Sequence, residues 1–111
     1  MEPIDTTFSA LADPTRRAIL SRLAAGEATV MELAQPFAMS QPAISRHLRV
    51  LEGAGLITRR IEGAKRPCRL APGGIAEVDQ WLALLRRALE TNYDRLDKVL
   101  AAQTKGRKDK P

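Results

Sequence analysis

Cysteine is almost absent from this sequence, which has one, at Cys68. A single cysteine excludes an intrachain disulfide framework and a cysteine-rich zinc module. No apolar run reaches the roughly 18 residues that a membrane-spanning helix needs. The first ten residues, MEPIDTTFSA, lack the basic and then apolar stretches of a secretory signal. These absences predict a cytoplasmic protein with no membrane partner.

Aromatic residues and the usual catalytic residue types are also scarce. The chain has two Phe, one Trp, one Tyr and one His. None of the aromatics lies between Arg46 and Arg69, where the basic residues gather, so a stacking platform for single-stranded nucleic acid is not indicated. One His and one Cys, without a Gly-rich phosphate loop or a paired set of carboxylates, leave little to catalyse with. The sequence therefore disfavours an enzyme and predicts no cofactor.

The chain length and composition allow one ordinary globular domain. Its 111 residues are 44% apolar and 28% charged, which excludes wholesale disorder. We expect one domain over residues 1–102, followed by a disordered basic tail over residues 103–111.

Positive charge is concentrated in the middle third of the chain. The net charge is +5, from 18 basic and 13 acidic residues. Residues 1–36 hold three basic and five acidic side chains, residues 37–72 hold seven and two, and residues 73–111 hold eight and six. The middle segment favours a polyanionic partner, with a solvated charged face as the alternative.

Capping residues and apolar spacing predict four helices in the first half of the chain. They are expected over residues 5–12, 14–25, 30–35 and 41–54. Asp5 or Thr6 would cap the first helix. Asp13, Thr29 and Ser40 would cap the other three, with Thr29 and Glu32 forming a capping box.

A β-hairpin and a long helix are expected in the second half. Residues 56–62 and 65–70 read as two strands joined by a Gly63-Ala64 turn, with Pro67 limiting the second to an edge. After a break at residues 71–74, apolar residues recur at helical spacing to about residue 102, which predicts a helix of roughly 40 Å. Its apolar stripe is broader than so small a core needs, so we expect a second copy of the chain as partner.

The element order predicts a fold class, mainly α with a small β-hairpin (α-α-α-α-β-β-α). Residues 29–54 have the proportions of a helix-turn-helix. The outward face of its second helix carries Gln41, Pro42, Ser45, Arg46 and Arg49. Because a helix fits the DNA major groove, and Gln and Arg recognise adenine and guanine there, double-stranded DNA is the favoured partner.

The hairpin over residues 56–70 is interpreted as a wing. Its five basic side chains repel one another unless a polyanion is bound. Side chains alternate between the faces of a strand, so all five cannot meet DNA together. Lys65 and Arg66 at the tip are the favoured contacts. Arg60 and Arg69 come next, and either could instead pair with Glu62 or with an acid of a helix.

Three stretches, FSALADPTRRAILSRL, MSQPAISRHLRVLEGAGLITRR and the GAKR turn, resemble the ArsR/SmtB family of bacterial winged-helix repressors. The resemblance runs from about Phe8 to Val99. It implies a winged helix-turn-helix that dimerises through its first and last helices. It also implies a recognition helix over about 41–54 in the major groove, a wing over about 56–70 on the backbone or minor groove, and repression, often of the protein's own promoter.

Two sets of site residues follow from these interpretations. The expected contacts to an operator of double-stranded DNA are Ser40, Gln41, Pro42, Ser45, Arg46, His47, Arg49, Arg60, Lys65 and Arg66. The expected homodimer contacts are Phe8, Leu11, Trp81, Leu82, Leu85, Leu89 and Leu96. For His47, packing against the domain is the alternative to a phosphate contact.

Metal sites of the resembled family have no counterpart here. Where the family has ELCxC, this chain has Glu32-Leu33-Ala34-Gln35-Pro36, without a thiolate. Where it has D-x-H and H-x-x-E, this chain has Asp79, Trp81, Asn92 and Arg95. We therefore expect no metal. The effector is unknown, and three alternatives stay open: none, a partner protein, or a small organic molecule. For the last, Trp81 and Tyr93 would line a cavity if they are not core or dimer residues.

Cys68 on the return strand has two interpretations. Arg66 and Arg69 beside it could lower its pKa and make it reactive. The alternative is an ordinary half-buried thiol. A winged helix that docks proteins rather than DNA is the competing function, although the charged face argues against it.

Overall fold

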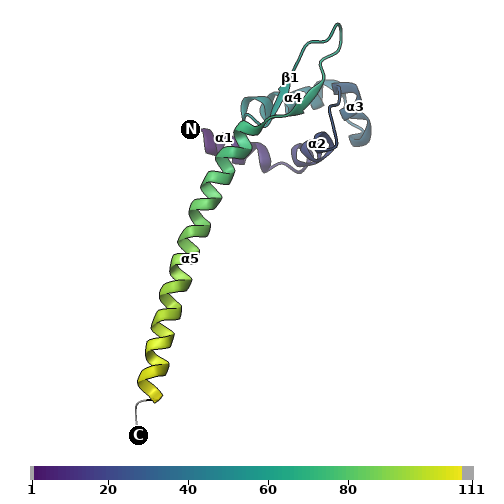
Figure 1. Ribbon diagram of the computed structural model, residues 1–111. Helices are drawn as coiled ribbons and strands as arrows, with labels where there is room; N and C mark the ends of the chain where they lie inside the picture. The colour runs from purple at the N-terminus through teal and green to yellow at the C-terminus, as the bar shows by residue number, and fades with distance from the viewer. Residues whose placement is uncertain (1, 109–111) are drawn as a thin grey trace. The chain divides into compact units, whose positions relative to one another are not determined.

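The structure is a computed structural model that describes residues 2–108, with the side chains of residues 2–103. The elements in chain order are α1 (Pro3–Leu11), α2 (Pro14–Ala24), α3 (Val30–Ala34), the 3-10 helix η1 (Gln35–Phe37), α4 (Gln41–Gly53), β1 (Ile57–Arg59), β2 (Cys68–Leu70) and α5 (Pro72–Lys108) (Figure 1). The chain forms two compact units, the first ending at Val78 and the second beginning at Asp79 within α5.

Side-chain caps start the three helices that follow α1, as predicted. The Asp13 carboxylate accepts from the Arg16 backbone N–H at 3.0 Å, and this bond holds the pKa of Asp13 below its usual value. The Thr29 hydroxyl accepts from the Glu32 N–H at 3.3 Å, while the Glu32 carboxylate accepts from the Thr29 N–H at 3.1 Å. The Ser40 hydroxyl accepts from the Ala43 N–H at 3.3 Å.

The first helix begins earlier than predicted, and neither expected residue is its N-cap. α1 starts at Pro3, and its N-cap is Glu2. Asp5 lies three residues inside, where its carboxylate accepts from the Glu2 N–H at 3.3 Å. A proline suits the first turn of a helix because it has no N–H to leave unpaired.

The last helix also begins earlier than predicted, for the same reason. Pro72 opens α5, so the break expected at residues 71–74 is wrong. α5 also continues beyond residue 102 to Lys108. The final part of the expected tail, residues 109–111, lies outside the described residues.

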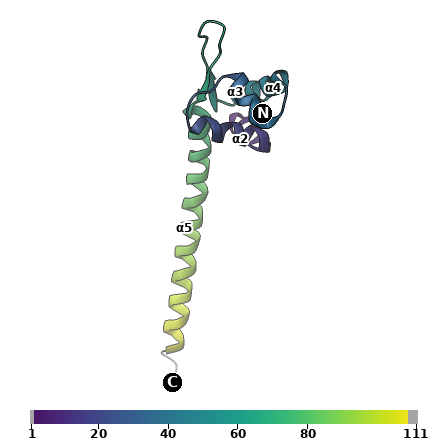
Figure 2. The ribbon, with the colours of Figure 1, turned by 90° about the vertical axis from the view of Figure 1, so that its right-hand side faces the viewer.

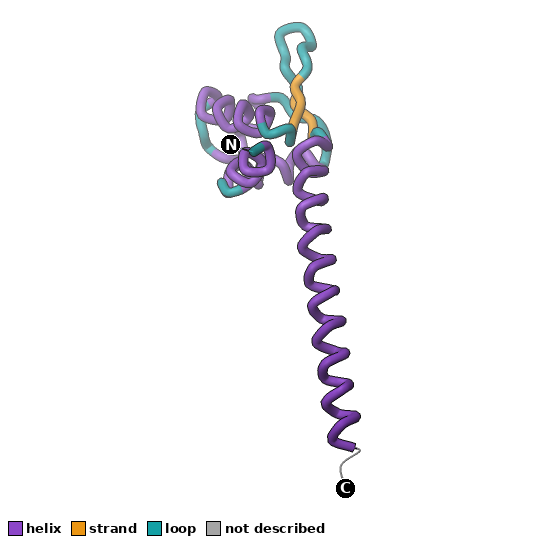
Figure 3. Tube along the Cα trace, turned by 90° about the vertical axis from the view of Figure 1, so that its left-hand side faces the viewer, coloured by secondary structure: helices purple, strands orange, loops and turns teal. Residues whose placement is uncertain are grey.

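The strands are shorter than the sequence pattern indicates. β1 and β2 pair antiparallel in the register Ile57↔Leu70, Thr58↔Arg69 and Arg59↔Cys68. Past this ladder the two arms are joined by the Arg60 N–H, which donates to the Pro67 carbonyl at 3.2 Å, and by an isolated bridge, Glu62↔Lys65. Pro67 has no N–H to donate, which stops regular pairing beyond Cys68. Figure 3 shows the tip as a loop that extends away from the helices of the first unit.

The core of the first unit lies where α4 meets the other elements. Ile44, Leu48 and Leu51 on one side of α4 have no exposed surface, and Ile19 of α2 and Leu33 of α3 join them. Truncating such a residue to Ala typically costs about 2–5 kcal/mol. The Thr7 hydroxyl donates to the Ala54 carbonyl at 3.3 Å and so links α1 to the end of α4. Figure 2 shows α3 and α4 beside the base of the hairpin.

Two glycines allow the start of α5 to approach the end of α4. A Cβ at Gly74 would lie 2.5 Å from the Ala54 carbonyl oxygen, closer than atoms pack. Gly55 adopts φ 71°, and its carbonyl accepts from the Gly74 N–H at 2.8 Å. This close approach joins the residues that follow α4 to the first turn of α5.

Candidate nucleic-acid interface

The face of α4 opposite the core is polar and open to solvent. Gln41, Pro42, Arg46 and Arg49 are exposed, as is the cap residue Ser40, and Ser45 is half-buried. All six were expected to contact DNA. Their exposure follows from the helical repeat, because the opposite side of the helix carries the buried apolar stripe.

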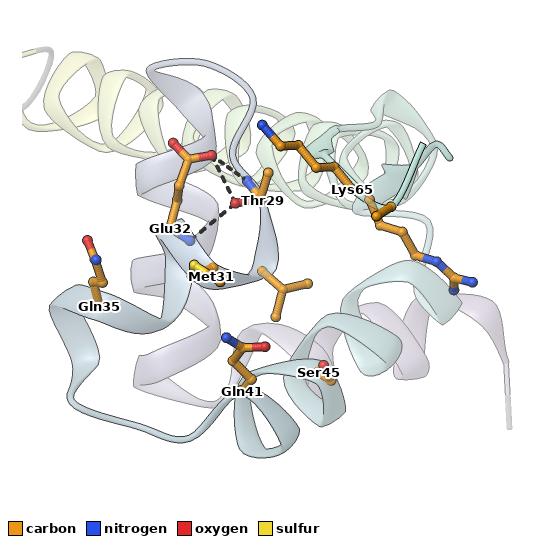
Figure 4. Close-up of a pocket in the computed structure, with 10 residues that line it drawn as sticks. Thr29, Met31, Glu32, Gln35, Gln41, Ser45 and Lys65 are labelled. Carbon is orange, nitrogen blue, oxygen red and sulfur yellow. Dashed lines mark hydrogen bonds between the residues drawn. The ribbon is translucent and has the colours of Figure 1, made fainter. Parts of the chain in front are cut away.

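A cavity of about 520 Å³ lies between α3, the first turns of α4 and the wing tip. Gln41 and Ser45 line it from α4, and Lys65 and Arg66 line it from the wing. Figure 4 shows Gln41 and Ser45 at the lower edge of this cavity, Lys65 at its upper right, and Thr29 and Met31 toward its upper and left sides. The fold thus brings four of the expected contacts to one concave surface, although they are far apart in the chain.

Residues of α3 also line this cavity, and sequence reasoning did not include them in the site. Met31 is 62% exposed there, unusual for its type, and Glu32 is exposed beside it. The Glu32 carboxylate is engaged by the Thr29 N–H and hydroxyl, which hold its pKa below the usual value. The sequence indicates only the capping role of Glu32 and contains no sign that this residue lies beside the wing.

Two of the basic side chains of the wing are paired with acids. Arg59 lies 3.1 Å from Glu52 of α4. Arg60 pairs with Glu27 and, at 3.0 Å, with Glu62, and these hydrogen bonds raise its pKa. For Arg60 the structure therefore has the ion pair that the sequence left as the alternative, so a DNA contact by Arg60 stays a prediction. Arg69 instead donates to the Thr58 hydroxyl at 3.4 Å.

The other expected cations are available to an anion. Arg46, Arg49, Lys65 and Arg66 are exposed, and none is ion-paired with any side chain in residues 2–103. We call Lys65 and Arg66 the tip cations. Unpaired cations bordering a concave surface attract a polyanion, because binding releases the counterions that otherwise accompany it.

His47 is packed against the domain rather than fully presented to solvent. Its side chain is 19% exposed, and its Nδ1 lies 3.3 Å from Arg16 Nη1 and 4.0 Å from Asp13 Oδ2. Arg16 also donates to the carbonyls of Ala10, at 2.8 Å, and Ser9, at 3.1 Å. Sequence reasoning missed Arg16, because nothing local distinguishes it from Arg17 beside it.

Of the two interpretations of Cys68, the structure disfavours the thiol activated by basic neighbours, and the thiol is more deeply buried than the half-buried alternative expected. The side chain is fully buried, and burial raises the pKa of its thiol. The charge of Arg59 opposes this shift but is the smaller effect. The cause is the strand's position: the Cys68 N–H donates to the Ala28 carbonyl at 2.8 Å, so that β2 lies against a second segment as well as β1.

The expected dimer residues of the second unit form a partly exposed apolar series along α5. Each is at least one-third exposed: Trp81 42%, Leu82 37%, Leu85 40%, Leu89 51% and Leu96 52%. In the first unit Phe8 is 36% exposed and Leu11 is half-buried. Across the described residues no helix is long and apolar enough to cross a membrane, and no three His, Cys, Asp or Glu side chains gather as metal ligands.

Comparison with known proteins identifies the relatives of this chain. Residues 13–59 match the model of the arsR family of bacterial regulatory proteins. The HTH-type transcriptional regulator Rv2034 of Mycobacterium tuberculosis is 44% identical over 82% of this chain and 75% of its own. The transcriptional repressor SdpR of Bacillus subtilis is 40% identical over 54% of this chain and 67% of its own.

Solved structures agree on the fold. An ArsR family transcriptional regulator, RHA00566, superposes with a TM-score of 0.74 at 42% identity, covering 79% of this chain and 91% of that one. A homodimeric winged helix-turn-helix DNA-binding domain from Mycobacterium bovis has a TM-score of 0.63 at 28% identity, covering 77% and 79%. The expected fold class is confirmed, and the relatives are regulators rather than enzymes. The chain belongs to the ArsR family of bacterial transcriptional regulators.

Proposed function

We propose that this protein is a homodimeric repressor that binds a specific double-stranded DNA operator, most simply its own promoter. The observation that carries the proposal is the concave surface on which exposed polar residues of α4 face the unpaired tip cations of the wing. An α-helix fits the major groove, and the basic wing then meets the backbone or the adjacent minor groove.

The residues divide into two roles by their chemistry. Gln41, Ser45 and Arg46, in the first turns of α4, have donors that reach base edges and give sequence preference. Arg49 lies further along α4 and the tip cations lie on the wing, so these side chains are assigned to phosphates. Ser40 and Pro42 bring the helix end and its N–H groups close to the backbone, where an anion is favoured.

The exposed apolar series on α5 supports the dimer. Leu85, Leu89 and Leu96 recur at helical spacing and are 40–52% exposed, a pattern that a second copy would bury. The related Mycobacterium bovis domain is homodimeric. Two copies place two α4 helices on DNA, so the operator is expected to have two matching half-sites.

The cellular setting follows from the function. A DNA-binding repressor works in the cytoplasm of a bacterium. Its effector is either absent or a small organic molecule that releases it from DNA, because the positions of the family's metal sites hold no suitable metal ligands here.

Binding of the purified protein to the DNA upstream of its own gene tests the proposal. Fluorescence anisotropy at two salt concentrations, with excess random duplex, separates specific from general binding. We expect a tight complex that survives the competitor, with two chains per site and affinity falling steeply with salt. Binding that the random duplex abolishes at every candidate promoter would contradict the proposal and favour a protein-docking module.

A further inference from the structure

Arg16 connects three parts of the first unit through one guanidinium group. Its Nε and Nη2 donate to carbonyls of Ala10 and Ser9 at the end of α1, at 2.8 and 3.1 Å. Its Nη1 lies 3.3 Å from Nδ1 of His47 on α4, 31 residues away in the chain. Arg16 lies on α2, outside the surface assigned to DNA.

This contact determines which ring nitrogen of His47 carries the proton. A guanidinium group only donates, so Nδ1 facing it must accept and the proton of the neutral ring must be on Nε2. Asp13, from the connection before α2, is the other charged group facing Nδ1. Its carboxylate is 4.0 Å away, beyond hydrogen-bond length, and already accepts from the Arg16 N–H. The hydrogen-bond partner of Nδ1 is therefore Arg16 and not Asp13.

The opposite nitrogen of the ring reaches solvent. No buried side-chain nitrogen or oxygen in the described part of the chain lacks a hydrogen-bond partner. His47 Nε2 has no hydrogen-bond partner among the described residues. It is therefore not a buried atom, in keeping with the 19% exposure of the side chain. His47 directly follows Arg46 on α4, so its Nε2–H is a donor on the helix assigned to the major groove.

We propose that Arg16 is a positioning residue for DNA binding: it holds His47 in the tautomer with the proton on Nε2, and that N–H donates to a phosphate oxygen of the operator. This inference rests on the proposed function and adds a residue that does not itself touch DNA. A phosphate oxygen accepts hydrogen bonds through its lone pairs and donates none. The other tautomer would turn an acceptor toward it, and no hydrogen bond could form.

The tautomer is measured on the free protein. His47 is the only histidine, so ¹⁵N-histidine labelling gives the signals of one ring. We expect the Nε2–H pattern in the wild type and a mixture of both tautomers in Arg16→Gln. The matched control is Arg17→Gln, because Arg17 donates to the Leu11 carbonyl at 2.7 Å, also at the end of α1, but does not contact His47. Arg17→Gln should keep the wild-type pattern.

Operator affinity is then measured for the same proteins. We expect Arg16→Gln to bind more weakly by the inverse of the fraction of rings that keep the proton on Nε2, about twofold for an equal mixture, without a change in the salt slope. Arg17→Gln should bind like the wild type. Equal losses in both variants would mean that Arg16 acts only by anchoring α1, and would overturn the inference.

Substitution of His47 tests whether Arg16 acts on operator affinity through the His47 ring rather than through the stability of the fold. The side chain of His47→Gln has an amide N–H near the Nε2 position and no tautomer to select. His47→Ala should lose about tenfold in operator affinity, and His47→Gln should recover part of that loss because its amide N–H replaces the donor. In the His47→Gln background, Arg16→Gln should have no further effect on affinity. A loss in that background as large as the one that Arg16→Gln causes in the wild type would overturn the inference.

The two proposals fail in different ways. If the wild type binds no operator, the proposed function fails, and with it the phosphate contact, whatever the ring signals. If the wild type binds its operator but its free ring carries the proton on Nδ1, only the inference about Arg16 fails.

Discussion

The Arg59 guanidinium of β1 lies 3.1 Å from the Glu52 carboxylate of α4, so the base of the wing is joined to the helix that supplies the polar face. Because Arg60 is likewise paired with Glu27 and Glu62, the charge of the strand is largely neutralised within the fold. Among the described residues of the hairpin, the cations without an acidic partner are the tip cations and Arg69, which donates to the Thr58 hydroxyl. The wing is thus expected to act on DNA through Lys65 and Arg66.

Replacing a tip cation should change the salt dependence of binding. We expect Lys65→Ala to weaken operator and random DNA alike and to lower the salt slope by about one unit. The control is the double variant Glu52→Gln with Arg59→Gln, which removes a charge pair without changing the net charge. Its slope should match the wild type. An unaltered slope in Lys65→Ala would show that this side chain does not meet a phosphate.

Arg46 is expected to read a base rather than a phosphate. Arg46→Ala should cost about 1–3 kcal/mol of operator binding and relax the preference at one base position. Affinities for the operator, for single-base variants of it and for random duplex provide the measurement. A loss of equal size on all of these duplexes would assign Arg46 to the backbone.

A charge within the apolar series of α5 should abolish the dimer. Leu85→Glu places a carboxylate where a second copy would bury a 40%-exposed leucine, so sedimentation should show a monomer and tight DNA binding should be lost. The control Arg87→Glu alters an exposed residue that the helical repeat places on another side of α5. A stable Leu85→Glu dimer would refute the assigned interface.

The Cys68 thiol should be unreactive while the protein is folded. Burial raises its pKa, so the protonated form is favoured in the folded state. This contribution to stability is complete below the pKa of the unfolded thiol and is lost as the pH rises through the higher folded value. Iodoacetamide labelling at neutral pH should be slow and should accelerate in denaturant. Rapid labelling of the native protein would contradict the buried position.

Glycine at the turn before α4 should stabilise the protein. Ala38 adopts φ 52°, the left-handed region, where the Cβ of an ordinary residue is strained. Ala38→Gly relieves this strain, and we expect a gain of about 0.5–1 kcal/mol in the free energy of unfolding, net of the added flexibility of the unfolded chain. Urea denaturation measures it. A lower midpoint for the variant would mean that the strain is absent.

Much of the fold could be derived from local patterns. Asp13, Thr29 and Ser40 cap helices through bonds to a residue three positions on, so a short window of sequence contains all the information. The apolar stripe of α4 likewise indicates which face is buried and which is left for DNA. The order of elements follows from these local signals, as does the helix-turn-helix.

Only the tertiary structure decided which charges remain free. Arg60 finds Glu27 at a separation of 33 residues, and Arg16 meets His47 at 31, so neither pair is visible in a local window. The same packing buries Cys68 between two segments and brings α3 beside the wing tip. The sequence by itself determined the elements and the supply of basic residues, since these depend on neighbours along the chain. The assignment of each cation to an ion pair, a ring nitrogen or solvent depends on which elements pack together.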